Sequence, residues 1–130
     1  MTGKKGKILL MDDESSIHRT VGRALQMLNY QVECTYDGAT AVQAYRAALA
    51  EGVPFDLIIA DLTVPGGLGG KEMMGRLLRL DPQVRAIVTS GYPDDPVVAH
   101  PGEHGFVDRL VKPFELQVLA ETVARVMRKP

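Results

Sequence analysis

The sequence predicts an α/β domain built on a parallel β-sheet, with helices covering both faces of the sheet. Two observations predict this fold. Five short apolar segments alternate along the chain with five stretches in which apolar residues recur at helical spacing. That strict alternation is typical of parallel sheets, whose strands are joined by helical crossovers. At 130 residues, with no internal repeat and no linker-like segment, the chain is expected to form a single domain.

The first half of the chain supplies two complete strand–helix units. The run KILLM at 7–11 predicts a buried strand, and 15–28 places apolar residues at helical spacing behind two serines that can cap a helix. Residues 31–36 mix polar and apolar side chains, which indicates a strand nearer the edge of the sheet. Residues 37–52 are rich in alanine, begin with a capping aspartate and end on a glycine, so they predict a helix.

The second half supplies three more units. The run FDLIIA at 55–60 predicts a strand buried on both faces, followed by an amphipathic helix at 69–82 that a proline ends. The last two strands are expected at 84–90 and 106–111. Between them, 94–105 allows only a short helix because Pro101 and Gly102 interrupt it. A final amphipathic helix is expected at 114–129.

Composition excludes several classes of function. The formal net charge of −1 argues against broad electrostatic binding to nucleic acid or anionic lipid, and no apolar run is long enough to span a bilayer. Cys34 is the only cysteine, which excludes an internal disulfide and suits a reducing compartment, so a cytoplasmic location is expected. Cys34 itself is expected to be buried in its strand. Residues 1–6 are expected to be a mobile tail and 7–128 the folded domain.

The chemistry of the chain is concentrated where the predicted strands end. Asp12 and Asp13 follow the first strand, Asp61 follows the third, Ser90 ends the fourth and Lys112 follows the fifth. In open parallel sheets, ligands bind outside the carboxyl ends of the strands. We therefore expect these five side chains to share one site. Asp56, at the opposite end of its strand from Asp61, is interpreted as structural.

Three neighbouring carboxylates indicate a cation site. Their charges repel in a partly buried setting unless a cation lies among them, and an all-oxygen ligand set suits Mg²⁺ or Mn²⁺. Lys112 supplies a further positive charge, and Ser90 with Gly91 leaves room beside Asp61. A carboxylate, a divalent ion, an ammonium and a hydroxyl are the groups needed to accept a phosphoryl group. Asp61 is then the expected nucleophile, forming an aspartyl phosphate.

The motifs ILLMDDE, DLIIADLTVPGG, IVTSGY and LVKPF, in this order, make the chain resemble the receiver domain of two-component response regulators over essentially its whole length. The resemblance implies a flavodoxin-like (βα)5 fold, with a doubly wound parallel sheet in the strand order 2-1-3-4-5. It also implies roles for the matching residues: Asp12 and Asp13 as metal-binding acids, Asp61 as phosphoacceptor, Ser90 as the switch hydroxyl and Lys112 as the family's lysine.

The resemblance implies further details. The backbone carbonyl of Thr63 becomes a metal ligand, and the Lys112–Pro113 peptide bond is expected to be cis. Arg109 occupies the position at which many receivers carry an aromatic residue, so the usual aromatic coupling is not expected here. The sequence around Asp61 and Ser90 resembles receivers attached to hybrid sensor histidine kinases more than those that precede DNA-binding domains.

The implied function is that of a phosphorylation-dependent switch. The partner is a histidine kinase or phosphotransfer protein, and a homodimer can form through the face made by the short helix in 94–105, the strand at 106–111 and the last helix. The only reactions the chain catalyses are phosphorylation and dephosphorylation of its own aspartate, without direct contact with nucleic acid or membrane.

Several other interpretations compete with these. The alternative function is a magnesium-dependent phosphatase with an aspartate nucleophile, although such enzymes carry Asp-x-Asp after the first strand, where this chain has Asp-Asp-Glu. A flavin module would need a hydroxyl- and glycine-rich loop there. Thr89 is the competing switch hydroxyl, and Asp61 considered alone would be interpreted as a turn residue. His18 is expected to be an exposed helix residue.

Overall fold

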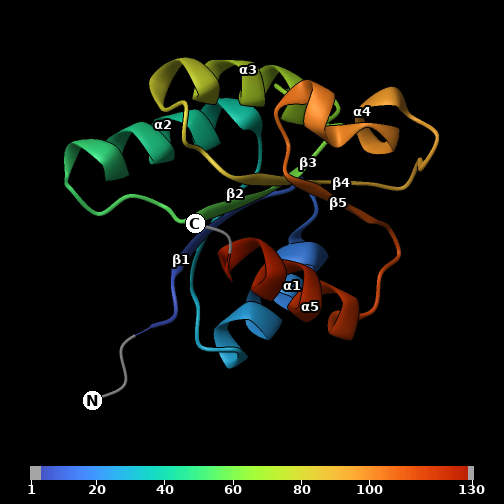
Figure 1. The fold of residues 1–130 in the computed structure, drawn as a ribbon, viewed down its shortest axis with the longest axis horizontal. Helices are drawn as coiled ribbons and strands as arrows, with labels where there is room; N and C mark the ends of the chain where they lie inside the picture. The colour runs from blue at the N-terminus through green and yellow to red at the C-terminus, as the bar shows by residue number, and fades with distance from the viewer. Residues whose placement is uncertain (1–3, 129–130) are drawn as a thin grey trace.

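The structure, a computed structural model, describes residues 4–128. Its strands are β1 (Lys7–Met11), β2 (Gln31–Thr35), β3 (Leu57–Asp61), β4 (Ala86–Ser90) and β5 (Asp108–Val111). Its helices are α1 (Ser15–Met27), α2 (Gly38–Ala50), α3 (Gly70–Leu80), α4 (Pro96–Ala99), the 3₁₀ helix η1 (Pro101–His104) and α5 (Leu116–Arg128). The strands form one parallel sheet in the order β2-β1-β3-β4-β5, so the predicted flavodoxin-like fold is confirmed (Figure 1).

Sheet position follows from the composition of each strand. All the residues of β3 and β4 are buried, as expected of strands covered by helices on both faces. The edge strand β2 leaves Gln31, Glu33 and Cys34 exposed. The expected burial of Cys34 was therefore wrong, because an edge strand lacks a neighbouring strand on one side.

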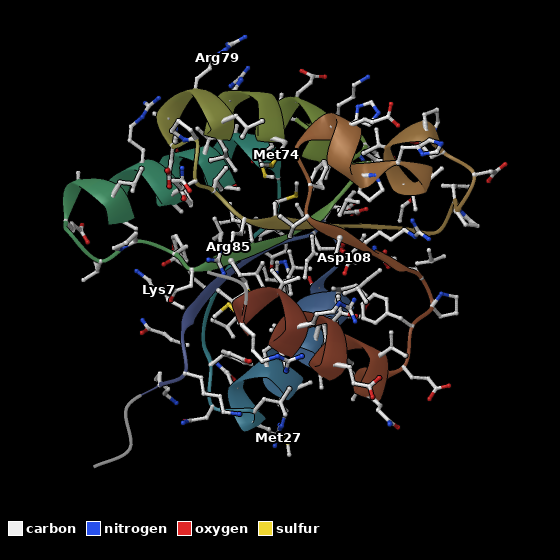
Figure 2. All side chains as sticks on the ribbon, in the orientation of Figure 1. Lys7, Met27, Met74, Arg79, Arg85 and Asp108 are labelled. Atoms are coloured by element: carbon white, nitrogen blue, oxygen red, sulfur yellow. The ribbon has the colours of Figure 1, made fainter. Side chains whose placement is uncertain are left out.

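The helices divide the core into two layers. Helices α2, α3 and α4 cover one face of the sheet, and α1 and α5 cover the other (Figure 1). Met74 of α3 is fully buried against the sheet, whereas Met27 at the end of α1 is 79% exposed. In Figure 2 their side chains correspondingly lie inside the α3 layer and at the outer surface of α1. The two layers fix the sheet from both sides, which holds the carboxyl ends of its strands in place.

The helix starts test the capping predictions. Asp37 caps α2 as expected, with its side chain accepting a hydrogen bond from the Thr40 amide at 2.8 Å. The prediction for α1 was wrong, because Ser15 and Ser16 lie inside the first helical turn and Glu14 is the N-cap residue. The short, interrupted fourth helix is confirmed as the single turn α4 followed by η1.

At the amino end of the sheet, Asp56 is structural as predicted. Its carboxylate accepts a hydrogen bond from the Lys7 amide at 2.8 Å, and its own amide donates to the Lys7 carbonyl.

The predicted tail comprises residues 1–6, of which positions 1–3 lie outside the described residues. Further on, the Lys5 amide donates to Asn29, and the Gly6 carbonyl accepts from Gln31. None of the helices between residues 4 and 128 has the length and hydropathy that crossing a bilayer requires.

Candidate functional site

The five predicted site residues meet at the carboxyl edge of the sheet. Asp12 directly follows β1, Asp61 is the last residue of β3, Ser90 the last of β4, and Lys112 directly follows β5. Since β1, β3, β4 and β5 are consecutive neighbours in the sheet, the strand order brings these ends together. The Lys112 amide also donates to the Ser90 carbonyl at 2.8 Å, which ties the ends of β4 and β5 to each other.

Asp12, Asp13 and Asp61 form an acidic cluster. One carboxylate oxygen from each lies within 4.8 Å of the others. Asp12 is 1% exposed and Asp61 6% exposed, whereas Asp13 faces solvent. Buried carboxylates are rare without a compensating charge, so the cluster needs a cation.

Lys112 supplies part of that charge. Its Nζ lies 2.9 Å from Asp12 Oδ2, 3.6 Å from Asp61 Oδ2 and 3.8 Å from Glu14 Oε1. Burial lowers the pKa of the Lys112 ammonium, but its hydrogen bond to Asp12 and the charges of Asp61, Asp12 and Glu14 outweigh burial, so the pKa is raised and Lys112 is charged at neutral pH. Glu14 was not among the predicted site residues, although it is the third acid of the motif DDE.

The acidity of Asp61 reflects its position. Burial raises the pKa of its carboxyl group, and the nearby charge of Lys112 opposes this rise. The charges of Asp12 and Asp13 raise the pKa further, while a hydrogen bond from the Thr63 amide at 3.4 Å lowers it. The result is a pKa of about 6, against an ordinary value of 3.8. A cation placed among the three acids would reverse this shift.

The cluster fits a hard divalent cation. Ligand oxygens in an octahedral Mg²⁺ site lie about 3 to 4 Å apart, because each is about 2.1 Å from the ion. The three carboxylate oxygens lie within 4.8 Å of one another, so they can converge on one ion, and all are hard oxygen donors. The part of the chain that the structure describes therefore contains a donor set suited to Mg²⁺.

The two candidate hydroxyl groups both lie at the end of β4. Ser90 is 3% exposed, and its Oγ accepts a hydrogen bond from the Tyr92 amide at 3.1 Å. Thr89 is equally buried and is the register partner of Asp61 in β3. Because side chains alternate along a strand, Ser90 points to the opposite face from Thr89. Since Thr89 is the register partner of Asp61, Ser90 lies one residue beyond Asp61 along the shared edge.

A tight loop holds Asp61 from the other side. The Gly70 amide at the start of α3 donates to the Leu62 carbonyl at 3.0 Å, which folds the loop back onto the end of β3. A Cβ atom on Gly69 would lie 2.5 Å from the Leu62 oxygen, and one on Gly70 would lie 2.8 Å from the Asp61 oxygen. Both positions therefore require glycine, which explains the second glycine pair of the motif VPGGLGG.

Three further predictions concern the surroundings of the site. The Lys112–Pro113 peptide bond is cis, as expected. Arg109 is exposed on β5, and its Nη1 donates to the Val98 carbonyl of α4 at 3.3 Å. The expected exposure of His18 was wrong. This residue is half-buried, with Nε2 2.8 Å from the Asp12 carbonyl oxygen, because α1 packs directly beneath the turn that follows β1.

Comparison with known proteins gives a consistent result. Residues 8–124 match the family model for the response regulator receiver domain. The chain is 30% identical over 125 residues to the DNA-binding transcriptional regulator NtrC of a Bradyrhizobium strain, covering 96% of this chain and 25% of NtrC. It is 26% identical to the sporulation initiation phosphotransferase F of Bacillus subtilis, with 93% of each chain covered.

Several of these relatives are much longer than this chain. Besides its quarter of NtrC, the chain spans 12% of the sensor kinase CckA of Brucella abortus and 53% of the regulator YkoG of Bacillus subtilis. The matched region in each corresponds to nearly the whole of this chain, at 96%, 94% and 97% of its length.

Solved structures share the fold. The receiver domain of the Pseudomonas aeruginosa sensor histidine kinase PA1611, solved with a magnesium ion in its active-site cleft, superposes with a TM-score of 0.84 at 22% identity, covering 98% of this chain and all of that one. The chemotaxis protein CheY4 of Vibrio cholerae gives a TM-score of 0.79 at 30% identity, covering 93% of this chain and 98% of that one.

Proposed function

Because this chain belongs to the response regulator receiver domain family, we propose that it accepts a phosphoryl group on Asp61 in a Mg²⁺-dependent reaction. The observation that carries the proposal is the position of Asp61, a buried carboxylate clustered with Asp12 and Asp13 and 3.6 Å from the Lys112 ammonium. The proposed donor is a phosphohistidine of a histidine kinase or phosphotransfer protein.

In the proposed step, an Asp61 carboxylate oxygen forms a bond to phosphorus while the phosphorus–nitrogen bond of the donor breaks. The departing imidazole keeps the electron pair of that bond and takes a proton. Asp12, Asp13, Asp61 and the Thr63 carbonyl would hold Mg²⁺ or Mn²⁺, which would supply positive charge to the phosphoryl oxygens. In the proposed hydrolysis, the oxygen of a water molecule forms a bond to phosphorus while the bond from the Asp61 oxygen to phosphorus breaks, which releases inorganic phosphate and restores the carboxylate.

Two side chains have proposed roles beside the nucleophile. Lys112 Nζ, already within reach of Asp12 and Asp61, can pair with a phosphoryl oxygen once Asp61 is modified. The Ser90 Oγ accepts a hydrogen bond from the Tyr92 amide and still has its own O–H to donate. We propose that Ser90 turns toward the phosphoryl group and thereby reports the modification to the loop that begins at Gly91.

The proposed partner surface is the α4–β5–α5 face, which also serves a homodimer. Val107, directly before β5, and Val118, in α5, are large apolar residues that remain 40% and 43% exposed. Residues 7–128 constitute the proposed receiver domain. We propose that it is of the kind attached to hybrid sensor histidine kinases. Its proposed location is the cytoplasm, where the free and exposed Cys34 would stay reduced.

Intact-mass measurement after incubation with acetyl phosphate tests the proposal. We expect one phosphoryl group per chain with Mg²⁺, none when EDTA removes the metal, and none in Asp61→Asn. Asp94→Asn, which removes an exposed carboxylate from the β4–α4 loop, is the matched control and should be labelled normally. Labelling of Asp61→Asn would contradict the proposal, and steady turnover of a phosphate monoester would favour the phosphatase alternative.

A further inference from the structure

His18 makes an unusual pair of contacts at the end of the sheet. Its Nε2 lies 2.8 Å from the Asp12 carbonyl oxygen and 3.0 Å from the Thr35 carbonyl oxygen. A carbonyl oxygen can only accept a hydrogen bond, so Nε2 must carry a hydrogen and donate it to both. This requirement is met by the neutral Nε2–H tautomer and by the imidazolium alike. The contact therefore does not depend on the charge of the ring.

These contacts complete the anchoring of Asp12. The Asp12 amide donates to the Thr35 carbonyl at 3.1 Å, and Asp12 Oδ1 accepts from the Glu14 amide at 3.0 Å. Without His18, the Asp12 carbonyl would lose its hydrogen-bond donor from α1 at this turn. His18 thus joins α1 to the ends of β1 and β2 at the residue that begins the acidic cluster.

The ring of His18 is itself held in place. The Tyr36 ring packs on it with centroids 4.4 Å apart and planes at 53°. Tyr36 directly follows β2, so the imidazole lies between this ring and the backbone turn after β1. A side chain packed on one side and bonded to two carbonyls has little freedom to turn, which makes it a rigid support.

We propose that His18 is a positioning residue of the metal site, holding the turn at Asp12 and Asp13 so that both carboxylates face the cation. The inference rests on the proposed function, because it concerns the metal that phosphorylation requires. His18 acts through the backbone of Asp12, because both of its hydrogen bonds go to backbone carbonyl oxygens and not to a carboxylate of the cluster. Losing an outer-shell support of this kind reduces metal affinity by about 10- to 100-fold in metalloproteins, and we expect a loss at the lower end, about tenfold.

Isothermal titration calorimetry with Mg²⁺ alone tests the positioning role of His18. The variants differ in side-chain length and in whether they carry an N–H donor. His18→Gln keeps an N–H donor at about the distance of Nε2, whereas His18→Asn is too short and His18→Phe has no donor. We expect His18→Phe and His18→Asn to bind Mg²⁺ about tenfold more weakly and His18→Gln to remain within about threefold of wild type. Gln26→Leu, at an exposed position near the end of α1, is the control and should bind normally.

Two further readouts separate positioning from general stability. Circular dichroism at low temperature confirms that each titrated variant is folded, and amide hydrogen exchange should become faster at Asp12 and Glu14 in His18→Asn but not in Gln26→Leu. Folded His18→Asn or His18→Phe with wild-type Mg²⁺ affinity and exchange would overturn the inference. Absence of Mg²⁺ binding by the wild-type chain would instead contradict the proposed function, and the exchange measurement would still decide whether His18 anchors the turn.

Discussion

The ionised carboxylate of Asp61 lowers the free energy of unfolding when no cation is bound beside it. Its carboxyl group has a pKa of about 6, raised from 3.8 first by burial and then by the charges of Asp12 and Asp13, which Lys112 and the Thr63 amide only partly offset. Above this pKa the folded chain must keep a buried negative charge that the unfolded chain would expose to water. The proposed role of Asp61 as a nucleophile, which must be both buried and ionised, accounts for this cost.

The pH dependence of stability follows from that shift. Between pH 3.8 and about 6 the folded state binds a proton that the unfolded state has released, so the contribution of Asp61 to the free energy of unfolding falls as pH rises through this window. Above pH 6 the full cost, about 3 kcal/mol, is present. We therefore expect Asp61→Asn to be more stable than wild type by about 3 kcal/mol at pH 7 in EDTA, and by less than about 1 kcal/mol near pH 4.

Urea unfolding at both pH values measures this difference. Asp94→Asn, an exposed position, should change the free energy of unfolding by less than about 0.5 kcal/mol at either pH. If metal-free Asp61→Asn were less stable than wild type at pH 7, the ionised Asp61 carboxylate would stabilise the folded state, which would contradict the prediction.

Among the structural elements, the entry into α3 determines where Asp61 is held. Gly70 begins this helix, and a Cβ atom there would lie 2.8 Å from the Asp61 carbonyl oxygen, which is backbone and cannot move aside easily. A Cβ atom on Gly75, in the middle of the same helix, would have nothing within 4 Å. One helix therefore contains a glycine required by close approach and one that is not.

We expect these two glycines to respond oppositely to alanine. Gly70→Ala should lose about 1 to 3 kcal/mol of stability and slow the labelling of Asp61, because the end of β3 must shift to admit the methyl group. Gly75→Ala should gain about 0.5 to 1 kcal/mol, since alanine is favoured over glycine in a helix interior. Chemical denaturation checks both, and stabilisation by Gly70→Ala would contradict the close approach.

A partly buried hydrogen bond joins α2 to the end of α3. Tyr45 of α2 is 2% exposed, and its hydroxyl donates to Asp81 Oδ2 at the end of α3 at 2.5 Å. Burial, followed by the bond to Asp81 and the charges of Asp81 and Asp56, raises the pKa of Tyr45, so the hydroxyl keeps its proton and donates it at neutral pH.

Tyr45→Phe removes this bond while keeping the ring. We expect a loss of about 1 to 2 kcal/mol in the free energy of unfolding, typical of a hydrogen bond to a charged acceptor. Tyr92→Phe, at a side chain that is 70% exposed, should have almost no effect. Equal stabilities for the two variants in thermal or urea unfolding would show that Asp81 is solvated equally well without Tyr45.

The fourth helix departs most from a regular strand–helix pattern. Pro101 and Gly102 end α4 after one turn, as the sequence predicts, and Asp95 caps its start by accepting from the Val97 amide. Arg109 of β5 donates to the Val98 carbonyl, which satisfies one of the acceptors left open at the end of so short a helix. The position that many receivers fill with an aromatic ring thus serves here to join β5 to α4.

Across the molecule, the sequence was sufficient to predict the sheet and the grouping of residues at its edge. Uninterrupted apolar runs such as residues 57–60 mark buried parallel strands, and parallel strands carry their carboxyl ends to one edge. Asp12, Asp61 and Lys112 could therefore be grouped without coordinates, although they lie far apart in the chain. The resemblance to a known family added the expected roles of Ser90 and Thr63.

What the sequence could not predict are contacts set by the exact packing of one element on another. His18 has the local context of an exposed helix residue, and only the placement of α1 against β1 and β2 brings it to two carbonyl oxygens. Glu14 reaches Lys112 because the helix begins one residue earlier than the serines indicate. Cys34 was predicted to be buried because residues in strands usually are, but β2 lies at the edge of the sheet and Cys34 is exposed.

The proposed switch depends on Asp61 being the residue that carries the phosphoryl group. This can be tested by treating the chain with acetyl phosphate and Mg²⁺, reducing any acyl phosphate with borohydride, and locating the product by peptide mass spectrometry. Borohydride converts an aspartyl phosphate to homoserine, which marks the modified position covalently. We predict homoserine at position 61, only when Mg²⁺ is present. Homoserine at another aspartate, or none at position 61 in a chain that gains a phosphoryl group, would contradict this assignment.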